Sequence, residues 1–204
     1  MAESQHPSPD DPQLAPAGLR VLLTTAGIVI AGALLGIAGG FIWAAAAPRA
    51  VFLVSSPGVA YVVNPETSAF IAADGWFSLV AVGGGILIAV AGYVAGIRRY
   101  GPLPALGVLA GATAAAFVAA WVGSRIGLTA FQHQLGSAKA GALIRQPVAL
   151  GAHGALAFWP LAAAATVGVI ELIAALGDRR RQAGPGPAAG VPRPAGQDAG
   201  RDLR

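Results

Sequence analysis

Four long stretches with little or no charge decide what this chain can fold into. They run over about 21–47, 76–97, 102–124 and 152–177, and the fourth contains one charge, Glu171. A helix needs about 20 apolar residues to cross a hydrocarbon core of ~30 Å. Backbone groups in lipid must be hydrogen-bonded internally, so each stretch is expected to be a helix. The sequence predicts an all-α membrane protein, a four-helix transmembrane bundle in the cell inner membrane.

Composition excludes several other classes of protein. Only 11% of the residues are charged, whereas a soluble domain carries about a quarter. No polar stripe of helical period runs along the four stretches, which argues against a soluble bundle. The net charge of +4 is not gathered into a basic patch, so no nucleic acid is expected as a partner. The absence of cysteine excludes disulfides and thiolate zinc sites.

The membrane domain is expected over 20–178, between two tails. Residues 1–19 and 179–204 are rich in proline, glycine and polar residues and are predicted to be disordered. A cleaved signal peptide ending near Ala44–Ala47 is an alternative for the first stretch, although the apolar region is longer than the usual 7–15 residues.

Basic residues and tryptophans indicate the orientation. Arg98 and Arg99 lie in a very short link, and short cytoplasmic links favour arginine, so both termini are expected in the cytoplasm. The loops 48–75 and 125–151 are then extracytoplasmic. In this topology all four tryptophans lie near the same membrane face, where their rings are expected to anchor at the interface: Trp43, Trp76, Trp121 and Trp159.

The two outer loops carry patterns of their own. In the first loop, β-branched and aromatic residues flank Pro57-Gly58, which predicts a small extracytoplasmic β-hairpin. A third short strand is expected over Ser68–Ala72, and Asp74 is expected to cap the second membrane helix or to serve as a polar group at the outer mouth. In the second loop, Phe131, Leu135, Ala138 and Ala142 predict an amphipathic helix that ends at Gln146-Pro147.

Small residues at four-residue spacing predict how the helices associate. The spacing occurs in the pairs or triplets Gly32, Gly36 and Gly40; Gly92 and Gly96; and Gly107 and Gly111. Such residues let helix backbones approach closely in lipid. They are expected to serve packing within one chain, and a contact between copies is the alternative. Pro160 is expected to kink the fourth span.

Few residues carry chemistry. Glu171 is an ionisable group inside a span, where it either pairs with Arg98 or Arg99 near the interface or relays protons or ions. His133 and His153 are expected on the same side as Asp74, but their spacing matches no zinc motif, so no metal or other cofactor is expected. The sequence around Ser124 is not G-x-S-x-G. We therefore expect no catalytic residues and no enzyme.

Two segments resemble recurring blocks of a known family. They are Ala69–Phe77, with Asp74, Gly75 and Trp76, and Leu150–Pro160, with His153 and Trp159. Both resemble an actinobacterial family of small uncharacterised membrane proteins, a domain of unknown function. The resemblance implies four spans with extracytoplasmic loops over roughly 20–176 and implies no activity. Since both blocks lie at outer span ends, we expect Asp74, Trp76 and Trp159 to share one outer surface.

The expected function is that of a non-catalytic accessory or scaffold subunit in the cell envelope. Its partners would be the lipid bilayer and a membrane protein that contacts the outer loops, with Asp74, Trp76, His153, Trp159 and Glu171 as candidate functional residues. The alternative is a small transporter or channel-like protein that uses Glu171. An enzyme acting on lipid, with His153, Asp74 and Ser124, is a more distant alternative. The oligomeric state is not predicted.

Overall fold

A computed structural model describes residues 14–64 and 68–182. Four long apolar helical segments support a multi-pass membrane protein, since each is long and apolar enough to cross a membrane; they cover Gly18–Ala46, Ala69–Tyr100, Leu103–Ser137 and His153–Arg181. A three-stranded antiparallel sheet accompanies them. The predicted fold class, a four-helix bundle with a small hairpin, is confirmed. Of the tails predicted to be disordered, 1–13 and 183–204 lie outside the described residues. Residues 14–19 and 179–182 are helical instead, because α1 begins at Leu14 and α6 continues to Gln182.

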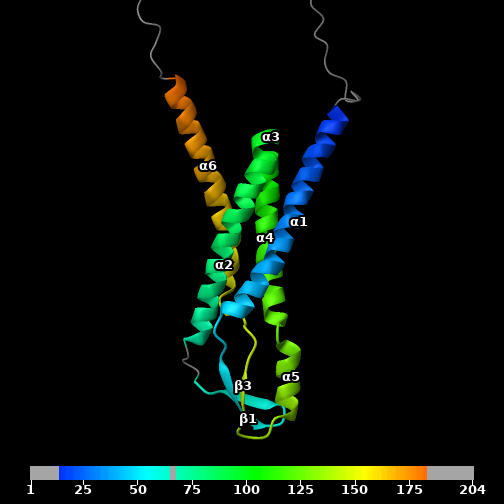
Figure 1. The fold of residues 1–204 in the computed structure, drawn as a ribbon, viewed down its shortest axis with the longest axis vertical. Coiled ribbons are helices and arrows are strands. Elements are labelled where there is room, and N and C mark those ends of the chain that lie inside the picture. The colour runs from blue at the N-terminus through cyan, green and yellow to red at the C-terminus, as the bar shows by residue number, and fades with distance from the viewer. Residues whose placement is uncertain (1–13, 65–67, 183–204) are drawn as a thin grey trace, which may run out of the picture. The chain divides into compact units, whose positions relative to one another are not determined.

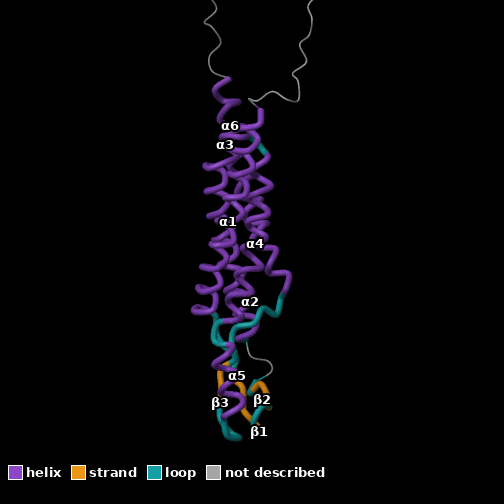
Figure 2. The backbone as a smooth tube through the Cα atoms, turned by 90° about the vertical axis from the view of Figure 1, so that its right-hand side faces the viewer, coloured by secondary structure: helices purple, strands orange, loops and turns teal. Residues whose placement is uncertain are grey.

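The helices have the following bounds: α1 Leu14–Ala46, α2 Ala69–Gly92, η1 Tyr93–Ile97, α3 Arg98–Tyr100, α4 Leu103–Arg125, α5 Leu128–Ser137, η2 His153–Ala157 and α6 Phe158–Gln182. The strands are β1 Val51–Ser56, β2 Val59–Val62 and β3 Leu143–Arg145. The chain forms two compact units, Met1–Gly168 and Val169–Arg204. In the first unit, α1, α2 and α4 lie together, and the sheet and α5 lie beyond one end of them, here called the sheet end (Figure 1). Figure 2 shows this arrangement from the side.

The glycines of α1 pack directly on α4. A Cβ atom added at Gly36 would lie 2.6 Å from the carbonyl oxygen of Ala115, and one added at Gly40 would lie 2.8 Å from that of Ala119. At Gly32 an added Cβ would collide with the backbone of Gly111. Backbone-to-backbone contact of this kind is how small residues let helices associate without a hydrophobic driving force. The small-residue pattern of α1 therefore serves packing within one chain.

Aromatic side chains fill the bundle near the sheet end. Trp43, Phe77 and Trp159 are completely buried, and the rings of Trp43 and Phe77 meet edge to face at 5.2 Å. Added Cβ atoms at Gly84 and Gly39 would meet the indole of Trp159, so glycine faces make room for this ring. The expectation of four interfacial tryptophans is thus wrong for Trp43 and Trp159, because close packing uses them as core. Trp76 and Trp121 are exposed.

The sheet has the order β2-β1-β3, and its strands come from both predicted loops. The β1–β2 hairpin turns at Pro57-Gly58, where Gly58 has φ 82°, as predicted. The third strand predicted over Ser68–Ala72 is wrong, because helix α2 already begins at Ala69, inside the expected outer loop. β3 from the second loop pairs with β1 instead. Pairing with β3 satisfies the backbone N–H and C=O groups on the edge of β1 that β2 leaves free.

Two further expectations about helix ends are corrected. α5 is the predicted amphipathic helix, but it ends at Ser137, well before Gln146-Pro147. The chain turns at Gly141, with φ 91°, and then forms strand β3, which pairs with β1. Pro160 is the third residue of α6, so it does not interrupt the span. The first turn of a helix has N–H groups without helical partners, and a proline there costs no hydrogen bond.

Candidate interaction site at the sheet end

Asp74 ties the beginning of α2 to the segment that precedes η2. Its Oδ1 accepts a hydrogen bond of 2.9 Å from the Gly151 N–H, and its Oδ2 accepts one of 2.9 Å from the Ala152 N–H. The cap predicted for the second membrane helix is therefore wrong, because α2 begins five residues earlier in the chain, at Ala69. The carboxylate instead fixes the segment that leads into η2. Gly151 suits this contact because an added Cβ would lie 3.2 Å from Oδ2.

Trp43 makes a second tie beside Asp74. Its indole N–H donates a hydrogen bond of 2.8 Å to the carbonyl oxygen of Ala73, and both residues are buried. The end of α1, the beginning of α2 and the segment before η2 therefore meet at residues 73 and 74. Sequence reasoning did not find this junction, because an indole and a backbone carbonyl 30 residues apart leave no pattern in the sequence.

The other candidate residues do not form one surface. Trp76 is exposed and Trp159 is fully buried, so the outer surface expected to combine them with Asp74 is wrong. His153 is exposed at the beginning of η2, next to the segment that Asp74 fixes. His133 is exposed on α5. Among the described residues, no group of three or more His, Cys, Asp or Glu side chains has the arrangement of a metal site.

Glu171 belongs to the second unit. It is exposed on the part of α6 that precedes Arg179, Arg180 and Arg181. Its pairing with Arg98 or Arg99 stays a prediction.

The two faces of the sheet differ in what they contact. One face carries Val54 and Ile144, which are buried, and Phe52, whose ring meets that of Phe131 of α5 edge to face at 6.3 Å. The opposite face carries Leu53, with Tyr61 and Leu143 as its direct cross-strand neighbours. These three side chains are 42%, 64% and 65% exposed. With Val51 and Val63 they form the apolar sheet face.

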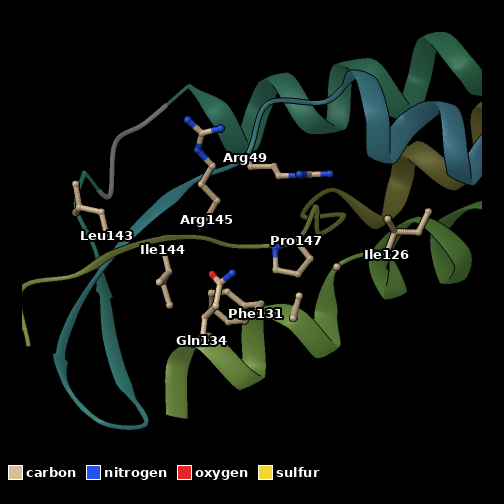
Figure 3. A pocket seen from close by; sticks show the side chains of 10 residues that line it. Arg49, Ile126, Phe131, Gln134, Leu143, Ile144, Arg145 and Pro147 are labelled. Carbon is tan, nitrogen blue, oxygen red and sulfur yellow. The ribbon is translucent and has the colours of Figure 1, made fainter. Parts of the chain in front are cut away.

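Two arginines lie beside this face, where β1 begins. Arg145 is the cross-strand neighbour of Val51, and Arg49 lies two residues before Val51 in the chain. Both line an open pocket of about 370 Å³, here called the arginine notch, with Ala45, Ala47, Pro48 and Val51. Both also line an adjoining pocket of about 380 Å³. Figure 3 shows them on the other side of the β3 segment from Phe131 and Gln134.

The notch was not predicted from the sequence. Two isolated arginines in otherwise weakly charged loops are the available signal, but they lie 96 residues apart (145 − 49). Only the pairing of β3 with β1 brings them to one place. A third arginine of this end, Arg125, has its guanidinium 5.3 Å from the ring centre of Trp121.

No protein-family model, no curated protein and no solved structure matches this chain. Membership of the actinobacterial family therefore stays a prediction.

Proposed function

We propose that this protein is a non-catalytic accessory or scaffold subunit of a cell-envelope complex and that its apolar sheet face binds a partner protein. The observation that carries the proposal is the exposed cluster of Leu53, Tyr61 and Leu143 on neighbouring strands. Contiguous exposed apolar patches mark interaction surfaces, and aromatic residues are enriched at the centre of such interfaces. α5 packs on the opposite face and supports the sheet from behind.

The proposal takes the sheet end to be extracytoplasmic and both termini to be cytoplasmic. Arg98 and Arg99 support this orientation, because they belong to the short α3 segment at the end of α2 away from the sheet. Short links rich in arginine favour the cytoplasmic side. The partner is then a membrane protein or an envelope protein that reaches the outer membrane–water interface.

The interior favours a scaffold over the alternative of a small transporter that uses Glu171. Within the described residues the buried side chains are apolar, and glycine and alanine make the closest helix contacts. Transport pathways in membrane proteins are built around polar groups inside the bundle. The core of the described residues is instead apolar and closely packed, which suits a structural support for the sheet end.

Site-specific photocrosslinking in native membranes tests the proposed function. A photoreactive amino acid at position 61 or 143 is expected to crosslink to the same protein, whereas one at Gln132, exposed on α5, is expected not to. Leu53→Asp in the same chains should abolish the crosslink, because a charge in the apolar face opposes desolvation. Equal crosslinking from position 132, or a crosslink that survives Leu53→Asp, would contradict the proposal.

A further inference from the structure

We propose that the arginine notch binds a phosphate group. The notch lies next to the apolar sheet face but is built from different side chains, and the inference does not depend on the proposed partner protein. Its two cationic residues, Arg49 and Arg145, line both adjoining pockets. Arginine presents a planar fork of N–H donors that matches phosphate oxygens two at a time.

Strand pairing fixes the backbone of Arg145, and a side-chain hydrogen bond orients Arg49. Arg145 is the last residue of β3, opposite Val51, and the next N–H, that of Gln146, donates to the Ala50 carbonyl oxygen at 3.0 Å. The Arg49 side chain is oriented by a hydrogen bond of 3.0 Å from its Nη2 to the Ala44 carbonyl oxygen. A guanidinium has five N–H donors, so further donors of Arg49 are available to a ligand. An arginine side chain that is already oriented loses less conformational entropy on binding, as for Arg49.

The charges of the notch favour an anion. Two arginine side chains that line the same pocket make it a favourable place for a negative charge. The described residues that line the two pockets include no Asp or Glu to neutralise them. On the notch side of the β3 segment, the side-chain donors are the guanidinium groups of Arg49 and Arg145. A phosphate group would satisfy this set of donors.

The position of the notch relates it to the membrane. Ala45 is one of the last residues of α1, which is long and apolar enough to span a bilayer, and Ala47 and Pro48 follow directly. The wall of the notch is therefore made where a spanning helix leaves the hydrocarbon. Lipid phosphates lie at this depth, and soluble phosphates reach it from the water. Both sources offer the same phosphate chemistry.

Ligand-dependent thermal unfolding of the full chain in detergent tests the inference. The probes are dioctanoyl phosphatidylglycerol, dioctanoylglycerol as its phosphate-free counterpart, and inorganic phosphate. A ligand that binds the folded state raises the unfolding midpoint, and the concentration dependence gives an apparent Kd. The variants are Arg49→Gln, Arg145→Gln, their combination and Arg145→Lys. Lys139→Gln is the matched control, because it removes one positive charge from the exposed turn before β3.

Support requires that phosphatidylglycerol raises the midpoint and dioctanoylglycerol does not, or that inorganic phosphate raises it. Each glutamine variant should weaken binding about tenfold, the typical effect of losing one charge-assisted hydrogen bond, and the double variant should abolish it. Arg145→Lys should lie between the wild type and Arg145→Gln, and Lys139→Gln should match the wild type. Competition by inorganic phosphate would identify a soluble phosphate as a ligand, and its absence would identify the lipid headgroup.

Three results would overturn the inference. They are no midpoint shift with either phosphate-bearing probe, undiminished binding by the folded double variant, and equal weakening by Lys139→Gln. The last result would show a general effect of positive charge. Circular dichroism of each variant before titration verifies that the helices are retained.

Discussion

The indole N–H of Trp43 donates a hydrogen bond to the carbonyl oxygen of Ala73 over 2.8 Å, and this bond joins the end of α1 to the beginning of α2. Ala73 is followed directly by Asp74, whose carboxylate fixes the segment before η2. The sheet end is thus tied to the bundle through two consecutive residues of α2. These bonds hold the end of α1 and the segment before η2 on the beginning of α2.

Replacing each buried tryptophan by phenylalanine should separate the role of this hydrogen bond from that of packing. Trp43→Phe removes the hydrogen bond to the Ala73 oxygen, which costs about 0.5–1.5 kcal/mol in addition to the lost contacts. Trp159 is equally buried, but its Nε1 has no hydrogen-bond partner among the described residues. Trp159→Phe should therefore lower the free energy of unfolding less, as measured by denaturant unfolding in detergent. An equal or larger loss for Trp159→Phe would contradict the hydrogen-bond argument.

Gly36→Leu should separate α1 from α4. Even a Cβ at position 36 would lie 2.6 Å from the Ala115 carbonyl oxygen, and backbone atoms cannot move aside cheaply. Overpacking of this kind costs about 1–3 kcal/mol or more, so the yield of monodisperse protein in size-exclusion chromatography should fall sharply. Gly27→Leu on the same helix is the control, because a Cβ there has nothing within 4 Å. Normal assembly of Gly36→Leu would mean that α1 and α4 do not meet at this residue.

Asp74→Asn and Asp74→Ala should loosen the segment before η2 to different degrees. Asparagine keeps one acceptor oxygen for the Gly151 or Ala152 N–H, whereas alanine keeps none. Each lost charge-assisted bond is worth about 1.5–3 kcal/mol of local stability. Hydrogen–deuterium exchange of a peptide covering residues 149–155 should be fastest in the alanine variant and intermediate in the asparagine variant. Unchanged exchange in Asp74→Ala would show that the carboxylate does not hold this segment.

Glu171→Gln distinguishes the proposed scaffold from the transporter alternative. If the apolar sheet face carries the function, neutralising Glu171 should leave protein abundance and crosslinking from position 61 at the wild-type level. If Glu171 is a proton or ion relay, the glutamine variant should assemble normally but lose the physiological function, since intramembrane charges are retained for such roles. Growth complementation of a deletion strain, measured beside crosslinking, reads both outcomes in one experiment.

The sequence determined the main architecture because hydrophobicity alone specifies membrane-spanning helices. Long uncharged stretches predicted four spans, Pro57-Gly58 predicted the hairpin turn, and the glycine spacing of α1 predicted a close helix contact. Each of these signals is local, since it depends on residues within a few turns of one helix or one hairpin.

Only the tertiary structure decided what the polar and aromatic residues do. Asp74 looked like a helix cap until α2 was found to begin at Ala69, and Trp159 looked like an interface anchor until the glycine faces of α1 and α2 were found to enclose it. The arginine notch exists because β3 pairs with β1 across almost a hundred residues of intervening chain. Hydrogen bonds and packing between distant segments depend on three-dimensional proximity, and single residues carry no signal of the partners they will meet.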